Sequence, residues 1–339
     1  MMARLAALAS GGGSLTYEEA RGAAGEILAG TAPADQTARL LSAMASRGET
    51  ADELAGMLDS MMGSCIRLDA PGAADLCGTG GDKLGTFNIS TAASFIAAAA
   101  GTRVAKHGNR GSSGAGSADV LEKLGCDLGQ GPEEAARLYD IHGICFAFAP
   151  AYHPAVANAA PARRMAGGRT IFNLLGPLAN PARPASQLVG VSAGADMGAM
   201  ARLLEGRGTS CIIARSACGA DELVTASACE VLWKGRILAL RPGDVGLHES
   251  DLSEIRAGGP DGALGALVGA VSGGGPRGAV ETAAFNAGAA LAAAGAEPDI
   301  AAGVAAALDT VKGGRAYRLL ERFVRDAGDP AVLEGIGDG

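Results

Sequence analysis

The chain has 339 residues, a net charge of −8 and a sequence pI of about 5.1, a balance that argues against a general nucleic-acid binder. Local lysines, arginines and backbone amides can still hold a phosphorylated substrate. Hydrophobic residues make up 48% of the sequence and aromatic residues 4%, so one large domain or two can form around a core of mainly Ala, Leu and Val.

The cysteines and the apolar segments indicate the compartment. Seven cysteines are scattered with no C-x-x-C pair, which predicts neither a disulfide framework nor a zinc site but small buried side chains in a reducing compartment. Residues 1–14 hold a Leu/Ala stretch too short for a signal peptide. No apolar run approaches the roughly 18 residues that a membrane span needs. We therefore expect a cytoplasmic protein without membrane contact.

Three helices are expected in the N-terminal part. Thr16 and Glu19 have the spacing of a capping box for the first helix, and Thr50 and Glu53 have it for the third. The expected helices run from residue 16 to about 30, from 34 to 47 and from 51 to 62. No strand pattern occurs here, so residues 1–66 are predicted to form a small α-helical domain. Four methionines on these helices are expected in core and subunit packing rather than at a ligand: Met44, Met57, Met61 and Met62.

From residue 74 the pattern changes to short apolar runs that alternate with helices. This alternation predicts an α/β domain over residues 74–339, with a mostly parallel sheet flanked by helices. A hairpin around Gly235 adds an antiparallel element, and an Ala-rich helical tail follows residue 278. The strands are expected at 74–77, 103–106, 144–149, 188–192, 210–214, 228–234 and 236–240.

Two glycine-rich turns lie between residues 74 and 125. The first reads Cys77-Gly78-Thr79-Gly80-Gly81-Asp82, and the second reads Lys106-His107-Gly108-Asn109-Arg110. Each follows a predicted strand, and a helix predicted from residue 88 to 100 starts after the first. Backbone can approach a phosphate closely at such glycines, and a helix N-terminus favours the anion. Two cradles suggest a substrate with more than one phosphate group, although tight strand–helix connections alone would also need these glycines.

The first turn is neither the dinucleotide fingerprint nor the phosphate loop of nucleotide-binding proteins. Together with three further motifs, however, the two turns resemble anthranilate phosphoribosyltransferase, in order and in spacing. The similarity covers nearly the whole chain, to about residue 288. The further motifs are Asn88-Ile89-Ser90-Thr91, Gly116-Ser117-Ala118-Asp119 and the stretch from Arg169 to Pro181, and Asp221-Glu222-Leu223 also matches.

The resemblance implies a fold and an activity. A small helical domain would be hinged to a larger α/β domain, a segment near residues 169–185 would return to the small domain, and two copies would form a homodimer through it. The enzyme would transfer the phosphoribosyl group of 5-phosphoribosyl 1-pyrophosphate (PRPP) to the amine of anthranilate in tryptophan biosynthesis. Its small-molecule substrates would be PRPP and anthranilate, and its cofactor would be Mg²⁺, as two ions, one or both arriving with PRPP.

The resemblance also assigns residues to these ligands. Lys106 and His107 would position the donor and stabilise charge without transferring a proton. The carboxylate of anthranilate would pair with Arg163, and Gly78, Asn109 and His153 would complete the acceptor site. The metal would be held by Ser90, Asp221 and Glu222. The residues implied for PRPP are Gly78, Gly80, Gly81, Asp82, Thr86, Asn88, Ser90, Thr91, Lys106 and Ser117.

Taken alone, several of these residues have plainer interpretations. An Asp-Glu pair such as Asp221-Glu222 is usually a solvated surface pair, and Arg163 with Arg164 would be a solvated helix face. His107 could be a hydrogen-bonded loop histidine. His142 and His248 have no motif around them and are expected to be structural or on the surface.

The sequence departs from the family pattern in two places. The loop at residues 111–116 is one residue shorter and lacks a customary Lys, and Val224 stands where Ser is common in a segment that also differs at 216–220. These differences leave open an acceptor that is another aromatic amine. Two other functions share the fold: a pyrimidine nucleoside phosphorylase, against which Asp221-Glu222 and residues 88–91 argue, and a non-catalytic nucleic-acid-binding relative, against which the net charge argues.

Overall fold

The computed structural model describes residues 1–111, 114, 116–192, 194–259 and 262–337. Contacts between Cα atoms divide the chain into two units. The helical unit consists of Met1–Arg67 and Ala149–Pro181, and the α/β unit consists of Leu68–Phe148 and Ala182–Gly339. The segment that returns to the helical unit begins at Ala149 and ends at Pro181.

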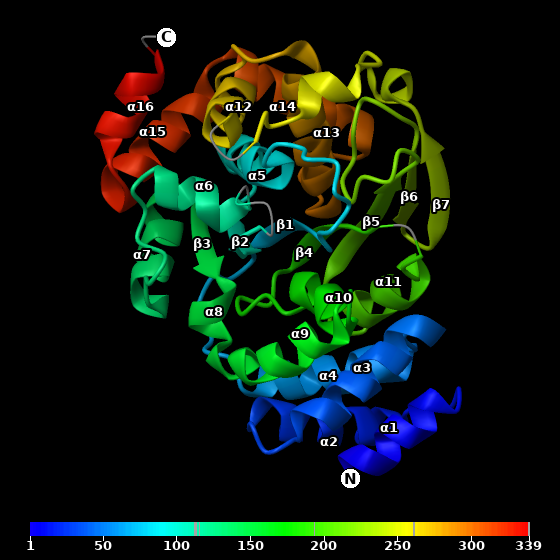
Figure 1. The fold of residues 1–339 in the computed structure, drawn as a ribbon. Helices are drawn as coiled ribbons and strands as arrows, with labels where there is room; N and C mark the ends of the chain where they lie inside the picture. The colour runs from blue at the N-terminus through cyan, green and yellow to red at the C-terminus, as the bar shows by residue number, and fades with distance from the viewer. Residues whose placement is uncertain (112–113, 115, 193, 260–261, 338–339) are drawn as a thin grey trace. The chain divides into compact units, whose positions relative to one another are not determined.

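The helical unit begins with four helices, shown in blue in Figure 1. They are α1 (Met2–Ser10), α2 (Tyr17–Leu28), α3 (Ala34–Arg47) and α4 (Ala51–Gly63). Both predicted capping boxes are confirmed, because Thr16 and Thr50 each exchange hydrogen bonds with the Glu three residues later. Helix α1 was not predicted; it forms where Met2, Leu5, Ala6 and Ala9 recur at helical spacing and are buried. The four methionines of the predicted stripe are also buried, as expected for core.

The returning segment completes the helical unit. It contains α8 (Ala149–Tyr152), the 3₁₀ helix η1 (Pro154–Ala159), α9 (Ala160–Ala166) and α10 (Ile171–Leu178). The Asn158 side chain donates to the Leu28 carbonyl at the end of α2 at 2.7 Å, and the Ile66 N–H donates to the Tyr152 carbonyl at 2.9 Å. These bonds explain why the return starts at Ala149.

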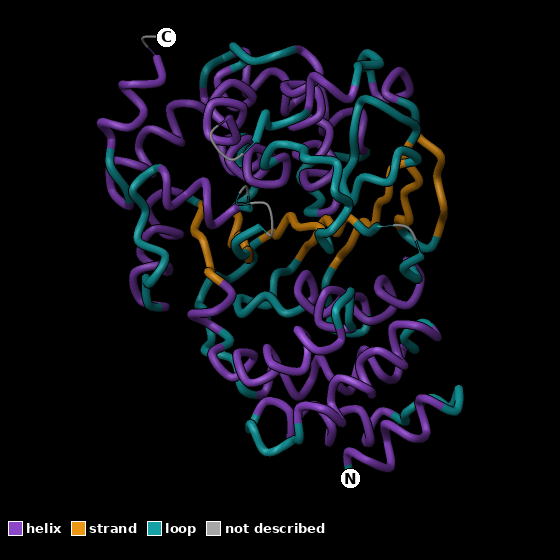
Figure 2. Tube along the Cα trace, in the orientation of Figure 1, coloured by secondary structure: helices purple, strands orange, loops and turns teal. Residues whose placement is uncertain are grey.

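The α/β unit is built on one seven-stranded sheet, drawn in orange in Figure 2. The strand order is β3-β2-β1-β4-β5-β6-β7, with β1 to β5 parallel and β6 and β7 antiparallel. The predicted strands are confirmed with small shifts at their ends. They are β1 (Ala74–Gly78), β2 (Val104–Gly108), β3 (Ile144–Phe148), β4 (Ser186–Gly190), β5 (Ser210–Ser216), β6 (Cys229–Trp233) and β7 (Arg236–Leu240).

The predicted hairpin is confirmed between β6 and β7. Its two central residues, Lys234 and Gly235, have φ values of 50° and 71°, as a two-residue turn matching the twist of the strands requires. Strand β7 lies at the sheet edge, where Ile237 is 66% exposed.

Helices cover the sheet in the way that its connections dictate. The chain moves from β1 to β2 in one direction along the sheet and from β4 to β5 in the other. Right-handed crossovers therefore place α5 (Ile89–Ala99) and α11 (Met197–Glu205) on opposite faces (Figure 1). The remaining helices are α6 (Ser117–Lys123), α7 (Pro132–His142), η2 (Pro242–Val245), η3 (Leu252–Ile255), α12 (Gly262–Ser272), α13 (Arg277–Ala293), α14 (Ile300–Lys312), α15 (Arg315–Ala327) and α16 (Pro330–Gly337).

The core of this unit is centred on α13, which packs against α5 and α14 and is buried along nearly its whole length. Gly288 of α13 and Gly303 of α14 meet so closely that a Cβ on either would collide with the backbone of the other helix. The predicted helical tail is thus confirmed as tightly packed helix. Within the described residues, no helix is both long and apolar enough to cross a bilayer.

Candidate active site

The reversal of strand order places a site at the carboxyl ends of β1 and β4. Parallel α/β sheets bind ligands at such switch points. Gly78 and Gly190 pair there as the last residues of the two strands, and Asp221 lies against both. A Cβ on Gly78 would collide with the Asp221 carboxylate, and a Cβ on Gly190 would collide with the Asp221 backbone. Glycine is therefore required at both strand ends for Asp221 to reach the site.

The first glycine turn wraps around the same carboxylate. Gly80 and Gly81 have φ values of 72° and 85°, which side chains rarely adopt, and the Gly80 N–H donates to Asp221 Oδ2. Thr79 anchors the turn to β4: its N–H donates to the Gly190 carbonyl at 2.9 Å, and its hydroxyl accepts the Ser192 N–H at 3.2 Å. Thr79 was not predicted as a site residue. The signal available in the sequence was a threonine between the glycines of the first turn.

The first turn of α5 provides the next group of site atoms. The Ser90 N–H donates to Glu222 Oε1 at 3.0 Å, so the helix N-terminus holds the second acidic residue. Thr91 is 1% exposed, and its hydroxyl has no hydrogen-bond partner within the described parts of the chain. Asn88 is buried at the N-cap position of the helix. An unsatisfied buried hydroxyl in the first turn of a helix suits an anionic ligand.

Strand β2 brings Lys106 to the same place. Its Nζ donates to Ser90 Oγ at 3.1 Å and to the Leu76 carbonyl at 2.7 Å, and the side chain is 3% exposed. Burial lowers the pKa of Lys106, while Asp75, Cys77 and Glu222 act in the opposite direction. The structure thus brings Ser90 and Lys106 together with Asp221 and Glu222, which lie more than 100 residues further along the chain.

The two adjacent acids are electrostatically unsatisfied. Burial raises the pKa of Asp221 to about 6, and the neighbouring Asp82 adds to this effect. Burial also raises the pKa of Glu222 well above its usual range, with Asp221 adding and Lys106 opposing. Lys106 therefore offsets only part of the effect of burial on Glu222.

The residues present fit Mg²⁺. Ser90, Asp221 and Glu222 provide hard oxygen atoms, which Mg²⁺ prefers, and a divalent cation beside the two buried carboxylates would favour their charged forms. Among the described residues, no group of three or more His, Cys, Asp or Glu side chains forms a complete metal cage. An ion held here would therefore take part of its coordination from substrate oxygens, as is usual for Mg²⁺ at phosphates.

The second glycine turn follows β2. A Cβ on Gly108 would collide with the Ser117 hydroxyl and lie 2.8 Å from the Phe146 ring, so these groups pack directly on the backbone. Ser117 Oγ donates to the Asn109 carbonyl at 3.3 Å, and the Asn109 side chain is in an exposed position.

The loop at 111–116 is closed by an acid that the sequence assignment did not name. Asp119 Oδ2 accepts the N–H groups of Gly111 at 2.8 Å and of Gly116 at 2.7 Å. The prediction about the shortened loop falls partly on residues 112, 113 and 115, which lie outside the described residues.

The other donor residues lie along the connection from β1 to α5. Asp82 Oδ1 accepts the Leu84 N–H at 3.1 Å, and Thr86 forms an antiparallel bridge with Arg256. His107 is 5% exposed, and its backbone N–H donates to Asp75 Oδ1 at 3.2 Å.

The predicted acceptor residues belong to both units. Gly78 and Asn109 are in the α/β unit, and His153 and Arg163 are in the helical unit. The Arg163 guanidinium lies 5.5 Å from the Phe172 ring centroid, and burial lowers its pKa. No carboxylate forms an ion pair with it in the described part of the chain. His153 is buried, its Nε2 lies 2.7 Å from the Ala179 carbonyl oxygen, and burial lowers its pKa.

The two histidines without a motif are structural or on the surface, as predicted. His142 lies 2.8 Å from Asp326, and His248 is exposed beside Glu281. All seven cysteines are free thiols, four of them buried.

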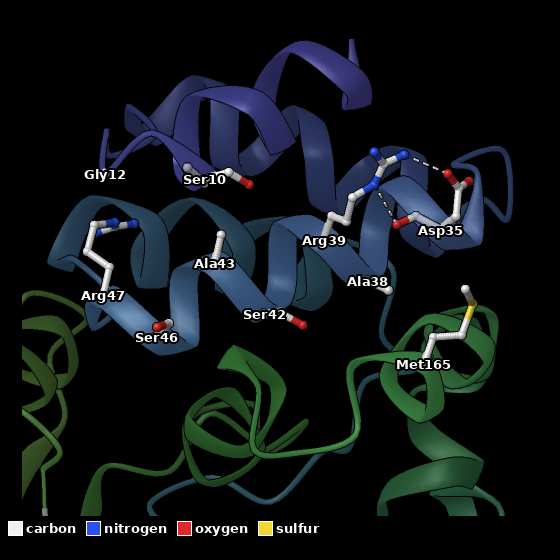
Figure 3. Close-up of a pocket in the computed structure, with 11 residues that line it drawn as sticks. Ser10, Gly12, Asp35, Ala38, Arg39, Ser42, Ala43, Ser46, Arg47 and Met165 are labelled. Carbon is white, nitrogen blue, oxygen red and sulfur yellow. Dashed lines mark hydrogen bonds and ion pairs between the residues drawn. The ribbon is translucent and has the colours of Figure 1, made fainter.

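A separate concavity lies in the helical unit (Figure 3). It has a volume of about 890 Å³, and α1, α3 and α9 line it. None of its residues was predicted to bind substrate. It is lined by Ala9, Ser10, Gly12, Asp35, Ala38, Arg39, Ser42, Ala43, Ser46, Arg47 and Met165.

Comparison with known proteins agrees with this geometry. A family model described as "Glycosyl transferase family, a/b domain" matches residues 70–317, and one described as "Glycosyl transferase family, helical bundle domain" matches residues 4–65. The anthranilate phosphoribosyltransferase of Cenarchaeum symbiosum is 46% identical over 332 residues, which are 95% of this chain and 96% of that protein. The chain belongs to the anthranilate phosphoribosyltransferase family.

Solved structures of the family share the fold. The crystal structure of anthranilate phosphoribosyltransferase from Thermus thermophilus has a TM-score of 0.89 and 38% identity, and the match covers 95% of this chain and 99% of that chain. The enzyme from Saccharomyces cerevisiae, solved in complex with PRPP and Mg, has a TM-score of 0.83 at 24% identity, covering 92% and 93% of the two chains. The family membership and the fold class expected from the sequence are therefore confirmed.

Proposed function

We propose that the chain transfers the phosphoribosyl group of PRPP to the amine of anthranilate, giving N-(5-phosphoribosyl)anthranilate and pyrophosphate in tryptophan biosynthesis. The bond from ribose C1 to the pyrophosphate oxygen breaks, with its electron pair leaving on pyrophosphate. The amine nitrogen forms the new bond to C1 and then loses a proton. The observation that carries the proposal is the convergence of Ser90, Lys106, Asp221 and Glu222 at the switch point.

The donor would be held between the two glycine turns. At Gly80 and Gly81 the backbone can approach its phosphate oxygens closely, the N-terminus of α5 favours an anion, and the buried Thr91 hydroxyl supplies a donor. Lys106, with His107 beside it, would neutralise charge as the pyrophosphate leaves. Asp82, Thr86, Asn88 and Ser117 complete the proposed set. Preorganised donors aimed at a departing anion are a large source of rate enhancement.

Magnesium would be held by Ser90, Asp221 and Glu222. Bound there, Mg²⁺ would stabilise the negative charge that develops on the leaving pyrophosphate. Two ions are proposed, one or both arriving with PRPP.

Anthranilate would be recognised by its carboxylate and its amine. Arg163 supports this assignment, since it is partly buried without an acidic partner among the described side chains. A planar guanidinium engages a carboxylate bidentately. Gly78, Asn109 and His153 are proposed as the remaining contacts. An aromatic amine is neutral at pH 7, so no general base or covalent nucleophile is required; the residues position the reactants.

The proposed assembly is a cytoplasmic homodimer formed through the helical unit. In the groove of Figure 3, the small residues Ser42, Ala43 and Ser46 lie on α3, and Met165 of α9 is 60% exposed. A second copy can approach closely over small residues. Light scattering should report a dimer for the wild type and a monomer for Ala43→Arg, and an unchanged mass would contradict this interface. The free thiols support a reducing compartment.

The decisive experiment follows the loss of anthranilate fluorescence on addition of PRPP and Mg²⁺. We expect rapid, magnesium-dependent loss. Arg163→Ala should raise the KM for anthranilate, and the double variant Asp221→Asn/Glu222→Gln should lose most activity and most magnesium dependence. Pyrophosphate release only with another aromatic amine would overturn the acceptor, and phosphorolysis of thymidine or uridine would overturn the reaction class.

A further inference from the structure

The seam between β1 and β2 differs from its neighbours in the parallel sheet. β1 pairs with β4 over all five of its residues, and β2 pairs with β3 over five residues. β1 and β2 are in register at Ala74 and Val104, and these two fully described strands form no further pair. The ladder between β1 and β2 is therefore present at the amino ends of the strands and does not continue toward the two glycine turns; we call this stretch without ladder pairs the open seam.

Two side chains take the place of the next rung in the ladder. In this register, a regular parallel pairing would join the His107 N–H to the Leu76 carbonyl. Instead the His107 N–H donates to Asp75 Oδ1 at 3.2 Å, and the Leu76 carbonyl accepts from Lys106 Nζ at 2.7 Å. Buried backbone groups need hydrogen-bond partners. Asp75 and Lys106 provide them for the His107 N–H and for the Leu76 carbonyl.

Asp75 is held from both sides. It is fully buried, and its second oxygen accepts from Gln187 Nε2 of β4 at 3.2 Å. Asp75 and Leu76 are consecutive residues of β1, and each bonds to β2: Asp75 to the His107 N–H and the Leu76 carbonyl to Lys106 Nζ. These two contacts fix the backbone after Lys106 and the end of its side chain, which also lies at Ser90 Oγ.

We infer that Asp75 is a positioning residue for the donor site: it holds Lys106 and the start of the second glycine turn across the open seam between β1 and β2. The inference rests on the proposed function, in which Lys106 contacts PRPP. Asp75 acts through Lys106 and through the His107 backbone.

The first test needs no substrate. Asp75→Asn keeps the size of the side chain and an oxygen for the His107 N–H, but removes the charge. Amine acylation followed by mass spectrometry should show Lys106 labelled about tenfold faster in this variant, which corresponds to about 1.4 kcal/mol of lost protection. Labelling of Lys123 and Lys312 should not change.

The matched control is Thr310→Val, which removes a buried hydroxyl that donates to the Ala306 carbonyl and accepts from Arg315, away from β1 and β2. It should lower stability without exposing Lys106. Equal labelling of Lys106 in the wild type and in Asp75→Asn, or equal acceleration in the control, would overturn the inference.

The second test is a double-mutant cycle on PRPP binding, measured by calorimetry with Mg²⁺. Asp75→Asn should weaken binding about tenfold, and Asp75→Asn/Lys106→Met should bind no more weakly than Lys106→Met alone, because one residue acts through the other. Additive losses would overturn the inference. A wild-type chain that binds no PRPP would overturn the proposed function, and the labelling rates would still decide whether Asp75 holds Lys106.

Discussion

At the scale of single residues, the site depends on two glycines, Gly78 and Gly190, because they have no side chain. Asp221 occupies the switch point because Gly78 and Gly190 leave room for it, and its carboxylate takes the Gly80 N–H. The same closeness leaves the acid in a place where its charge is poorly solvated. The close packing that places Asp221 at the switch point therefore also buries its carboxyl and raises its pKa.

Gly190→Ala should disrupt the site, because the new methyl group collides with the Asp221 backbone rather than with a flexible side-chain end. We expect a loss of about 1–3 kcal/mol in unfolding free energy, the range for overpacking, and loss of PRPP binding. Urea unfolding and calorimetry measure the two effects. Gly265→Ala on α12 is the control: no atom lies within 4 Å of the added Cβ, so stability should rise by about 0.5–1 kcal/mol. Equal behaviour of the two variants would contradict the packing argument.

The raised pKa of Asp221 predicts a pH dependence of stability in the metal-free protein. A carboxyl whose pKa is raised on folding contributes stability that is present below its unfolded pKa, near 4, and is lost as pH rises through about 6. Each pKa unit corresponds to about 1.4 kcal/mol, so Asp221→Asn should gain about 2–3 kcal/mol relative to the wild type between pH 4 and pH 8. Urea unfolding in a chelating buffer would show it. A difference between the two proteins that stays constant with pH would contradict the assignment.

At the scale of elements, the capping residues explain why the helices begin where they do, but their energetic weight depends on burial. Glu53 is fully buried and accepts the N–H groups of Thr50 and Leu15 as well as the Arg47 guanidinium. One capping carboxylate thus joins the start of α4, the end of α3 and the loop before α2. The spacing in the sequence predicts the cap, and only the fold adds the other two partners.

Glu53→Ala should therefore cost about 3–5 kcal/mol of unfolding free energy, the range for breaking a buried pair and leaving its partners unsatisfied. Asp35→Ala is the matched control on α3. It removes an exposed ion pair with Arg39 at 2.7 Å, which should contribute no more than about 0.5 kcal/mol. Chemical unfolding of both variants measures the contrast. Similar losses would show that burial is not what gives Glu53 its weight.

At the scale of the whole molecule, all the proposed donor and metal residues lie in the α/β unit, and the acceptor residues are divided between the two units. PRPP with Mg²⁺ should therefore stabilise the α/β unit directly. Arg163, the proposed partner of the acceptor carboxylate, belongs to the returning segment of the helical unit.

PRPP with Mg²⁺ at about 100 times the dissociation constant should raise the unfolding free energy by about 2.7 kcal/mol. Hydrogen exchange should slow at the first glycine turn, in α5 and at the end of β2. A chelator should remove most of the effect, and so should Asp221→Asn/Glu222→Gln. Stabilisation that persists in either case would contradict the proposed metal ligands.

The sequence by itself determined the helix caps, the alternation that makes an α/β sheet, and the motifs that carry the family resemblance, because spacing and glycine content express local geometry. Helix α1 escaped prediction because its four buried residues needed partners to be recognised as core. Tertiary structure alone decided which groups meet. Strand order brings Asp221 beside Gly78 and Gly190. At the open seam, Asp75 and Lys106 bond to the backbone of the opposite strand. These contacts join segments up to about 140 residues apart, and no local pattern in a single chain encodes such a distance.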